Sequence, residues 1–310
     1  MMPLLIDGVI YASIITLLAI GFTLTYLTSR IPNFAQGTFA SVGVYVTFTV
    51  TRIWGLNVYV AVPLGFILSA LIATLVYKGV LGILKKHGAS IVSLMISTLA
   101  VELLLLASIN IYADTIQTRL RVISRTFLLR YLDFSFMGYP GIFIVSITLV
   151  LSLIIGLYLL LNRTKFGIAM RATVEDPDLA STLGVNVELV STVSWFLTGG
   201  LAGIAGCLIP LWFQSDPNAG SKLLVSVFAA SVLGGLSSIY GAILGGYVIG
   251  LTETLGNSIL TRLLGGWVAY YRLLIPLTIL CLTLLYAPRG LAGIIESVQA
   301  RGYRLRLIRR

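Results

Sequence analysis

The sequence predicts an all-α protein that crosses a membrane many times as a bundle of helices. Hydrophobic residues make up 58% of the chain and charged residues only 10%, and the mean hydropathy is +1.01, which is far from the balance of a water-soluble domain. Apolar runs long enough to cross a hydrocarbon core recur along the whole chain. A membrane β-barrel would need strands of alternating polarity, whereas segments such as 142–161 are apolar on every face. We therefore expect a single transmembrane domain over residues 1–310.

Charged clusters separate the apolar runs and mark the expected ends of the helices, because a charge at the centre of a membrane helix is costly. The pattern predicts about eight or nine membrane helices, and the seventh is short enough to be a half-helix. The expected spans are, in chain order, 4–28, 34–50, 58–80, 89–111, 141–161, 187–213, 223–236, 240–260 and 273–286.

The basic residues predict how the bundle lies in the membrane. If all nine spans cross, the N-terminus is outside, and the loops that contain Arg30, Lys85 and Arg171 are cytoplasmic. The basic tail, residues 287–310, is cytoplasmic too, and its arginines would attract anionic membrane lipid. The segment 112–140 does not follow the rule that basic residues gather in cytoplasmic loops, because its arginines would face the outside. Loops and tail account for the net charge of +10, so a nucleic-acid partner is not expected.

The sequence contains no recognisable catalytic or metal-binding pattern. Its one histidine, His87, stands beside two lysines in a loop, and no H-E-x-x-H, C-x-x-C or G-x-S-x-G occurs. The phosphate-binding pattern G-x-x-x-x-G-K-[ST] is also missing. We therefore expect no enzyme activity, catalytic residue, metal site or cofactor in this chain. If transport is driven by ATP, another subunit must bind it.

Three pairs of glycines, each four residues apart, predict close contacts between helix backbones. Such contacts either pack helices inside one chain, or form an interface between subunits or line the translocation pathway. The pairs are Gly199 with Gly203, Gly241 with Gly245, and Gly246 with Gly250.

The most informative polar stretch, residues 162–187, interrupts two apolar spans and is built to contain a short helix. Leu179 and Leu183 are four residues apart and would share one face of this helix. That face must rest either on the chain's own bundle or on another protein, and the residues alone leave both open. A capping aspartate, a first-turn proline and a terminating glycine define the helix: Asp176, Pro177 and Gly184.

Four segments together carry a resemblance to a known family: GFTLTYLTSRIPNFAQGTFASVGVY from Gly21, RATVEDPDLASTLGVN from Arg171, VLGGLSSIYGAILGGYVIG from Val232 and APRGLAGI from Ala287. In these segments, and in their order, the chain resembles the LivH-type permeases of ABC importers for branched-chain amino acids. The resemblance implies a permease subunit that translocates branched-chain or other amino acids through the cytoplasmic (inner) membrane of a prokaryote. It also implies three kinds of partner: a second, LivM-like permease, two cytoplasmic ATPases that bind ATP and Mg, and an external substrate-binding protein.

The resemblance also implies roles for particular residues. In the family, the loop that matches 162–187 couples the permease to the ATPase, which favours docking of the short helix on a partner. The expected coupling residues are Glu175, Asp176, Pro177, Asp178, Ala180, Leu183 and Gly184.

Four further residues are candidates for the translocation pathway. Asn33, Phe34 and Gln36 lie at the start of the second span, where capping of the helix is the alternative role. Gln36 stands where the family usually has histidine, so its side chain can only form amide hydrogen bonds. Glu253 is the fourth candidate, because a carboxylate inside an apolar span is costly and such residues are often functional. Glu102 is a similar carboxylate without a family counterpart, and a helix–helix hydrogen bond is the alternative for both.

Two other function classes remain to be weighed. An ion-coupled secondary transporter of a small polar solute would use broken helices and carboxylates near the middle of the membrane, and only Glu102 and Glu253 are available for that. A membrane-embedded enzyme would need several convergent polar groups, which the sequence does not offer.

Overall fold

The computed structural model describes residues 2–288 and 290–293. Most of the predicted basic tail, including every arginine from Arg301 onward, lies outside the described residues. Within them the regular secondary structure is helical apart from two two-residue strands, β1 (Ser135–Phe136) and β2 (Tyr139–Pro140). Six of the described helical segments are long and apolar enough to cross a membrane. The prediction of an all-α, multi-pass membrane protein is therefore confirmed.

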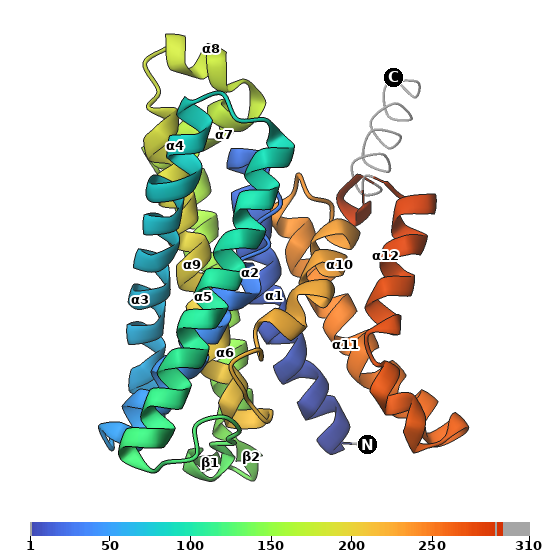
Figure 1. Cartoon of the computed structure of the whole chain (residues 1–310). Coiled ribbons are helices and arrows are strands. Elements are labelled where there is room, and N and C mark those ends of the chain that lie inside the picture. Colours follow the sequence, from blue (N-terminus) through green and yellow to red (C-terminus); the bar gives the residue numbers. More distant parts are fainter. Residues whose placement is uncertain (1, 289, 294–310) are drawn as a thin grey trace, which may run out of the picture. The chain divides into compact units, whose positions relative to one another are not determined.

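The chain forms two compact units. Unit 1 comprises Met1–Thr23 and Val225–Arg310, and unit 2 comprises Leu24–Leu224. Helix α1 (Met2–Ser29) begins in unit 1 and ends in unit 2 (Figure 1). The other helices of unit 1 are α10 (Leu224–Gly234), α11 (Ile239–Leu264), the 3-10 helix η6 (Gly266–Tyr271) and α12 (Leu274–Tyr286).

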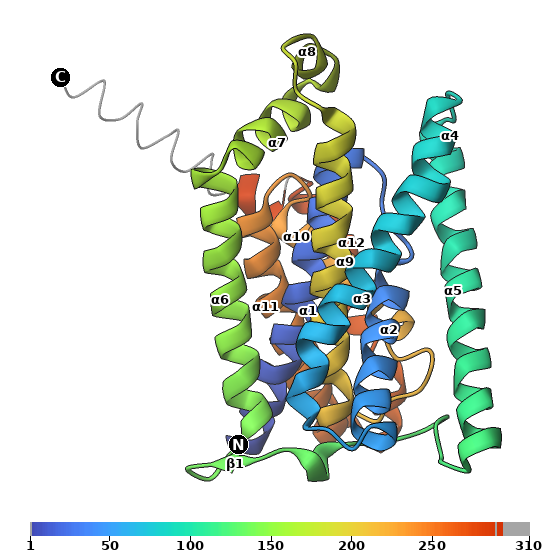
Figure 2. The same ribbon diagram turned by 90° about the vertical axis from the view of Figure 1, so that its left-hand side faces the viewer.

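Unit 2 holds the remaining helices. Its α4, α7 and α8 lie at one end and its β1–β2 hairpin at the other (Figure 2), as expected if the loops with Arg30, Lys85 and Arg171 share one side of the membrane. Each of the nine predicted spans overlaps a helix in the described residues, but three of these helices are not among the six that are long and apolar enough to cross: α2 with η1, α10 and α11. The elements are α2 (Gln36–Phe48), η1 (Thr49–Ile53), η2 (Val58–Val60), α3 (Ala61–Val76), η3 (Tyr77–Leu81), α4 (Gly82–Lys86), α5 (Ile91–Leu120), η4 (Arg130–Leu132), α6 (Gly141–Arg163), α7 (Lys165–Glu175), α8 (Pro177–Thr182), α9 (Val187–Trp212) and η5 (Ser221–Leu223).

The core of unit 2 is the tight packing of α2, α3 and α9. A Cβ atom at Gly203 of α9 would overlap the carbonyl oxygen of Gly65 in α3, and one at Gly206 would overlap that of Ala40 in α2. Because glycine has no Cβ, the backbones of these helices can touch. The predicted glycine pairs therefore pack helices within the chain.

Unit 1 uses glycine in the same way. Gly245 of α11 lies against Ala230 of α10, and Gly250 lies against Ala12 of α1. Gly246 and Gly250 are four positions apart in α11, so both contact the same neighbouring helix, α1. Of the two roles left open by the sequence, packing inside one chain is the one these contacts serve.

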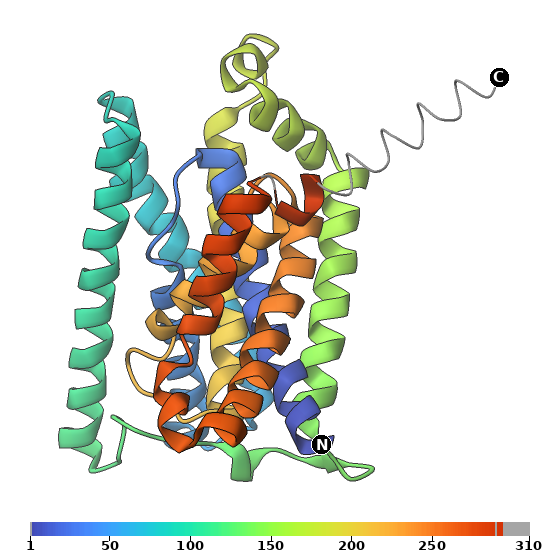
Figure 3. The same ribbon diagram turned by 90° about the vertical axis from the view of Figure 1, so that its right-hand side faces the viewer.

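The segment that did not fit the charge pattern, 112–140, continues α5 to Leu120 and then crosses the end of unit 2 to α6 (Figure 3). Two of its arginines are held by protein groups. Arg125 forms a two-pronged ion pair with Asp114, with both nitrogen–oxygen distances 2.7 Å, and the Arg130 guanidinium lies 3.7 Å from the centre of the Trp212 ring. These partners stabilise positive charge at this end independently of which side of the membrane it faces.

Candidate functional site

The α7–α8 segment at one end of unit 2 contains the predicted coupling residues. Asp176 Oδ1 accepts hydrogen bonds from the backbone nitrogens of Asp178 and Leu179, both at 3.0 Å, and thereby caps α8. Pro177 occupies the first turn, where its missing N–H costs nothing. Gly184 follows the helix with φ +85°, a conformation that favours glycine. The short helix and all three of its sequence signals are confirmed.

One face of α8 is uncovered in the structure. Leu179 is 58% exposed and Leu183 is 75% exposed, whereas the neighbouring Ala180 is buried. The two leucines therefore do not rest on the chain's own bundle, which was one of the two arrangements left open by the sequence. Neighbouring Glu175 and Asp178 are exposed as well, so the surface offers an apolar centre flanked by acidic groups.

Helix α7 connects this surface to the membrane helices. Thr164 caps its start by accepting a hydrogen bond from the Gly167 backbone, at 3.3 Å, and Met170 is buried on its inner side. At its end, the Arg30 side chain donates a 2.8 Å hydrogen bond to the carbonyl oxygen of Val174. Because Arg30 directly follows α1, a displacement of α7 would also move the connection between α1 and α2.

The connection between α1 and α2 contains three of the predicted pathway residues. The chain runs back along unit 2 without helical structure, and α2 begins partway between the two ends of the unit (Figures 2 and 3). Asn33 Oδ1 accepts a 3.1 Å hydrogen bond from the Ala35 backbone, and Asn33 Nδ2 donates to Gln36 Oε1 at 3.4 Å. Both side chains are fully buried. Asn33 thus forms a hydrogen bond with a backbone N–H at the start of α2. The pathway role of Asn33, Phe34 and Gln36 stays a prediction.

Polar side chains from two other elements meet the start of α2. The Phe34 backbone donates to Thr98 Oγ1 of α5 at 3.4 Å, and the hydroxyls of Thr38 and Ser221 lie 3.4 Å apart. The Glu102 carboxyl, one turn after Thr98 on α5, lies beside the Ser221 hydroxyl. Sequence reasoning missed Thr98 and Ser221, because small hydroxyl residues in apolar spans are common and their partners lie far away in the chain.

Glu253 occupies a different kind of site, inside unit 1. Its carboxylate accepts hydrogen bonds from the Tyr11 hydroxyl at 2.8 Å, from the Ser226 hydroxyl at 2.7 Å and from Arg272 Nε at 2.7 Å. Its side chain is 1% exposed. These bonds join α1, α10 and the segment before α12 to α11, which is the helix–helix role named as the alternative. Its pathway role stays a prediction. Arg272 escaped sequence reasoning because it lies between two predicted spans.

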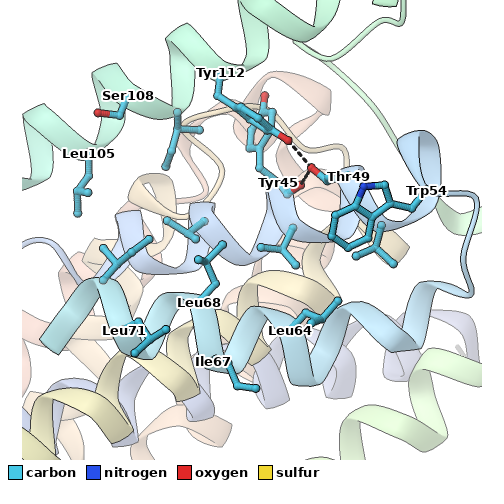
Figure 4. Close-up of a pocket in the computed structure, with 15 residues that line it drawn as sticks. Tyr45, Thr49, Trp54, Leu64, Ile67, Leu68, Leu71, Leu105, Ser108 and Tyr112 are labelled. Atoms are coloured by element: carbon cyan, nitrogen blue, oxygen red, sulfur yellow. Dashed lines mark hydrogen bonds between the residues drawn. The ribbon is translucent and has the colours of Figure 1, made fainter. Parts of the chain in front are cut away.

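An apolar cavity of about 570 Å³ lies between α2, α3 and α5 of unit 2 (Figure 4). Its few polar side-chain groups are hydroxyls and the Trp54 indole N–H, and the hydroxyls of Thr49 and Tyr112 bond to each other at 2.7 Å. No charged side chain lines the cavity. It therefore offers no group that could hold a charged or zwitterionic solute, and the polar groups around the start of α2 are better placed to do so.

Comparisons with known proteins identify the family. The model of the family described as branched-chain amino acid transport system, permease component, matches residues 4–284. The chain is 42% identical over 292 residues to the probable branched-chain amino acid transport permease protein LivH of Methanocaldococcus jannaschii, covering 94% of this chain and 92% of that protein. It is 27% identical over 302 residues to the high-affinity branched-chain amino acid transport system permease protein LivH of Escherichia coli K12, covering 93% and 94%.

Among solved structures, PsaBC from Streptococcus pneumoniae in complex with Fab matches 92% of each chain with a TM-score of 0.51 and 14% identity. At this identity the match concerns the fold alone. The sequence matches extend over almost the full chain and agree with the resemblance carried by the four segments. The chain belongs to the family of permease components of branched-chain amino acid transport systems.

Proposed function

We propose that this chain is a permease subunit of an ATP-driven ABC importer, and that the importer translocates branched-chain or other amino acids delivered by an external binding protein. Membership of the permease family and the names of the relatives support the proposal. The comparisons do not support the ion-coupled alternative. Of the two carboxylates available for that alternative, Glu253 is already paired with Arg272.

The proposed importer contains a second, LivM-like permease and two cytoplasmic ATPases, which bind ATP and Mg, in the cytoplasmic membrane of a prokaryote. The observation that carries the docking proposal is the exposed apolar face of α8. Leu179 and Leu183 lie on a helix whose conformation is fixed by Asp176 and Gly184. A capped helix with an uncovered apolar face is suited to fit a groove on a partner.

Movement of the ATPases reaches the membrane helices through α7 in this proposal. ATP binding closes the ATPase pair and carries α8 with it. The hydrogen bond from Arg30 to the Val174 carbonyl then transmits the displacement to the connection between α1 and α2. Rocking of the two permeases exposes the pathway to one side of the membrane and then the other, and the chemistry stays on the ATPases.

The test is ATP-driven amino acid uptake by the complete transporter in proteoliposomes. Asp178→Arg reverses an exposed charge on α8 and should uncouple ATP hydrolysis from uptake while membrane insertion stays normal. Asp114→Arg on α5 is the control, because it reverses an exposed charge at the opposite end of unit 2. Tagged wild-type chain should also recover an ATPase and a second permease from its host in mild detergent. Normal uptake by Asp178→Arg would contradict the docking assignment.

A further inference from the structure

Glu102 is a carboxylate at membrane depth whose role the family membership does not explain. It lies eleven residues after the first residue of α5, Ile91, and eighteen before the last, Leu120. At 1.5 Å per residue these separations correspond to about 16 Å and about 27 Å along the helix. Because α5 is long and apolar enough to cross a membrane, these separations place Glu102 within the membrane-crossing part of the helix. Charged groups at such depth almost always face the interior of a bundle or a water-filled cavity.

No positive charge in the described part of the chain pairs with Glu102. The nearest cation along the chain from its neighbour Ser221 is Lys222, and Lys222 forms an ion pair with Asp216. Glu253 presents a clear contrast, because Arg272 balances its charge inside unit 1. Glu102 is only partly buried. The described residues therefore supply no counter-charge for Glu102, and the residue is partly exposed.

The groups around Glu102 are those that bind a primary ammonium group. The Ser221 hydroxyl lies beside the carboxyl, and Thr98 stands one turn earlier on the same helix, next to the start of α2. An ammonium group has three donors and no acceptor, so a carboxylate together with hydroxyl oxygens matches it. These groups come from α5 and η5, and Thr38 of α2 closes the cluster through its contact with Ser221.

We propose that Glu102, with Ser221, binds the α-ammonium group of the transported amino acid during its passage through unit 2. The proposal rests on the proposed function and makes it more specific. The solute must carry a positive charge next to its side chain, as a zwitterionic amino acid does. Glu102 is then a specificity-determining residue of the pathway.

The test is uptake of labelled leucine by the complete transporter in proteoliposomes, at saturating leucine-loaded binding protein. Glu102→Gln keeps the size and polarity of the side chain but removes the charge. Uptake per assembled complex should fall at least about tenfold, because a hydrogen bond to a charged group is lost. ATP hydrolysis stimulated by the loaded binding protein should persist. Glu102→Asp should keep most of the uptake.

Asp114→Asn is the matched control, since it removes a carboxylate from the same helix at an exposed site, and its uptake should equal that of wild type. Equal uptake by Glu102→Gln and wild type would overturn the ammonium site and leave the proposed function intact. A wild-type transporter that imports no amino acid would overturn the proposed function and the site together.

A second measurement covers variants that assemble poorly. Glu102→Cys is made in a Cys281→Ser background, in which the remaining Cys207 is buried. A side chain that lines an aqueous pathway reacts with a water-soluble, positively charged thiol reagent, and leucine-loaded binding protein with ATP should slow the reaction. A cysteine at position 102 that does not react would show that this side chain is packed away from the pathway, and would overturn the proposal.

Discussion

At the scale of single residues, the pairing of Glu253 with Arg272 makes a prediction about stability. Glu253→Gln leaves the Arg272 guanidinium without its counter-charge, although the Tyr11 ring still lies 4.1 Å from it. Removal of one partner from a fully buried pair costs about 3–5 kcal/mol, and the cost here should be smaller, because the Arg272 side chain is 33% exposed. The thermal unfolding midpoint of the purified chain in detergent should fall clearly.

Glu188→Gln is the control for this change. The ion pair between Lys86 and Glu188 is exposed on both sides, at 68% and 55%, and such pairs contribute about 0–1 kcal/mol. Its midpoint should therefore match wild type. An unchanged midpoint in Glu253→Gln would show that the Arg272 charge is satisfied by other groups.

Sequence reasoning at this scale succeeded where the signal was local. Asp176, Pro177 and Gly184 act within four residues of α8, so their side-chain chemistry and backbone conformation could be predicted. It failed for Arg272 and Ser221. Their importance comes from contacts with distant groups that no local pattern predicts, and Arg272 in particular appeared only as one more basic residue between two spans.

At the scale of helices, α8 should depend on its cap. Asp176→Ala removes the acceptor for the amides of Asp178 and Leu179, a loss that costs about 0.5–2 kcal/mol. Hydrogen exchange at Leu179 and Ala180 should accelerate in the purified chain, while Asp176→Asn should protect them nearly as well as wild type. Equal exchange in the alanine variant would mean that packing alone holds α8.

Close packing of α9 against α2 makes a second prediction at this scale. Gly206→Ala places a Cβ where the Ala40 carbonyl oxygen lies, so the two helices must separate and the thermal midpoint should fall strongly. Gly156→Ala on α6 is the matched control, because nothing lies within 4 Å of its added Cβ. That substitution should leave the midpoint unchanged or raise it, since alanine is favoured over glycine in helices. Similar midpoints for both variants would contradict the observed packing.

The positions of the helices along the sequence could be predicted, but the course of the chain between them could not. Apolar runs bounded by charges predicted a helix in each of the nine segments, and six of these helices are long and apolar enough to cross a membrane. The backward course of the chain between Ser29 and Gln36 could not be predicted, because a short loop and a chain that returns into the membrane have the same composition. This return places Phe34 beside Thr98 of α5.

At the scale of the whole molecule, the ends of unit 2 should face opposite sides of the membrane. Ser181 in α8 and Ser135 in β1 are both exposed, at opposite ends of the unit. In a Cys281→Ser background, Ser135→Cys should react with an impermeant thiol reagent in intact cells, and Ser181→Cys only after the cells are opened. The reverse pattern would place α8 outside the cell and would exclude its docking on cytoplasmic ATPases.

The distribution of basic residues was sufficient to group the loops at each end of unit 2, because lysine and arginine in short loops follow the orientation of the helices. It was not sufficient for the segment 112–140. There, Asp114 and Trp212 provide local partners for arginines, and such contacts depend on the folded structure rather than on the membrane. The division of the chain into two units is also a tertiary feature without a composition boundary.

The uncovered leucines of α8 have a consequence for the life of the protein in the cell. Until its partner binds, a newly inserted chain displays Leu179 and Leu183, and exposed apolar side chains are what chaperones and proteases recognise in incomplete proteins. Chains made in excess over the ATPase should be degraded faster than assembled ones. The supply of ATPase would then set the number of permeases, and transporters without an energy source would not accumulate in the membrane.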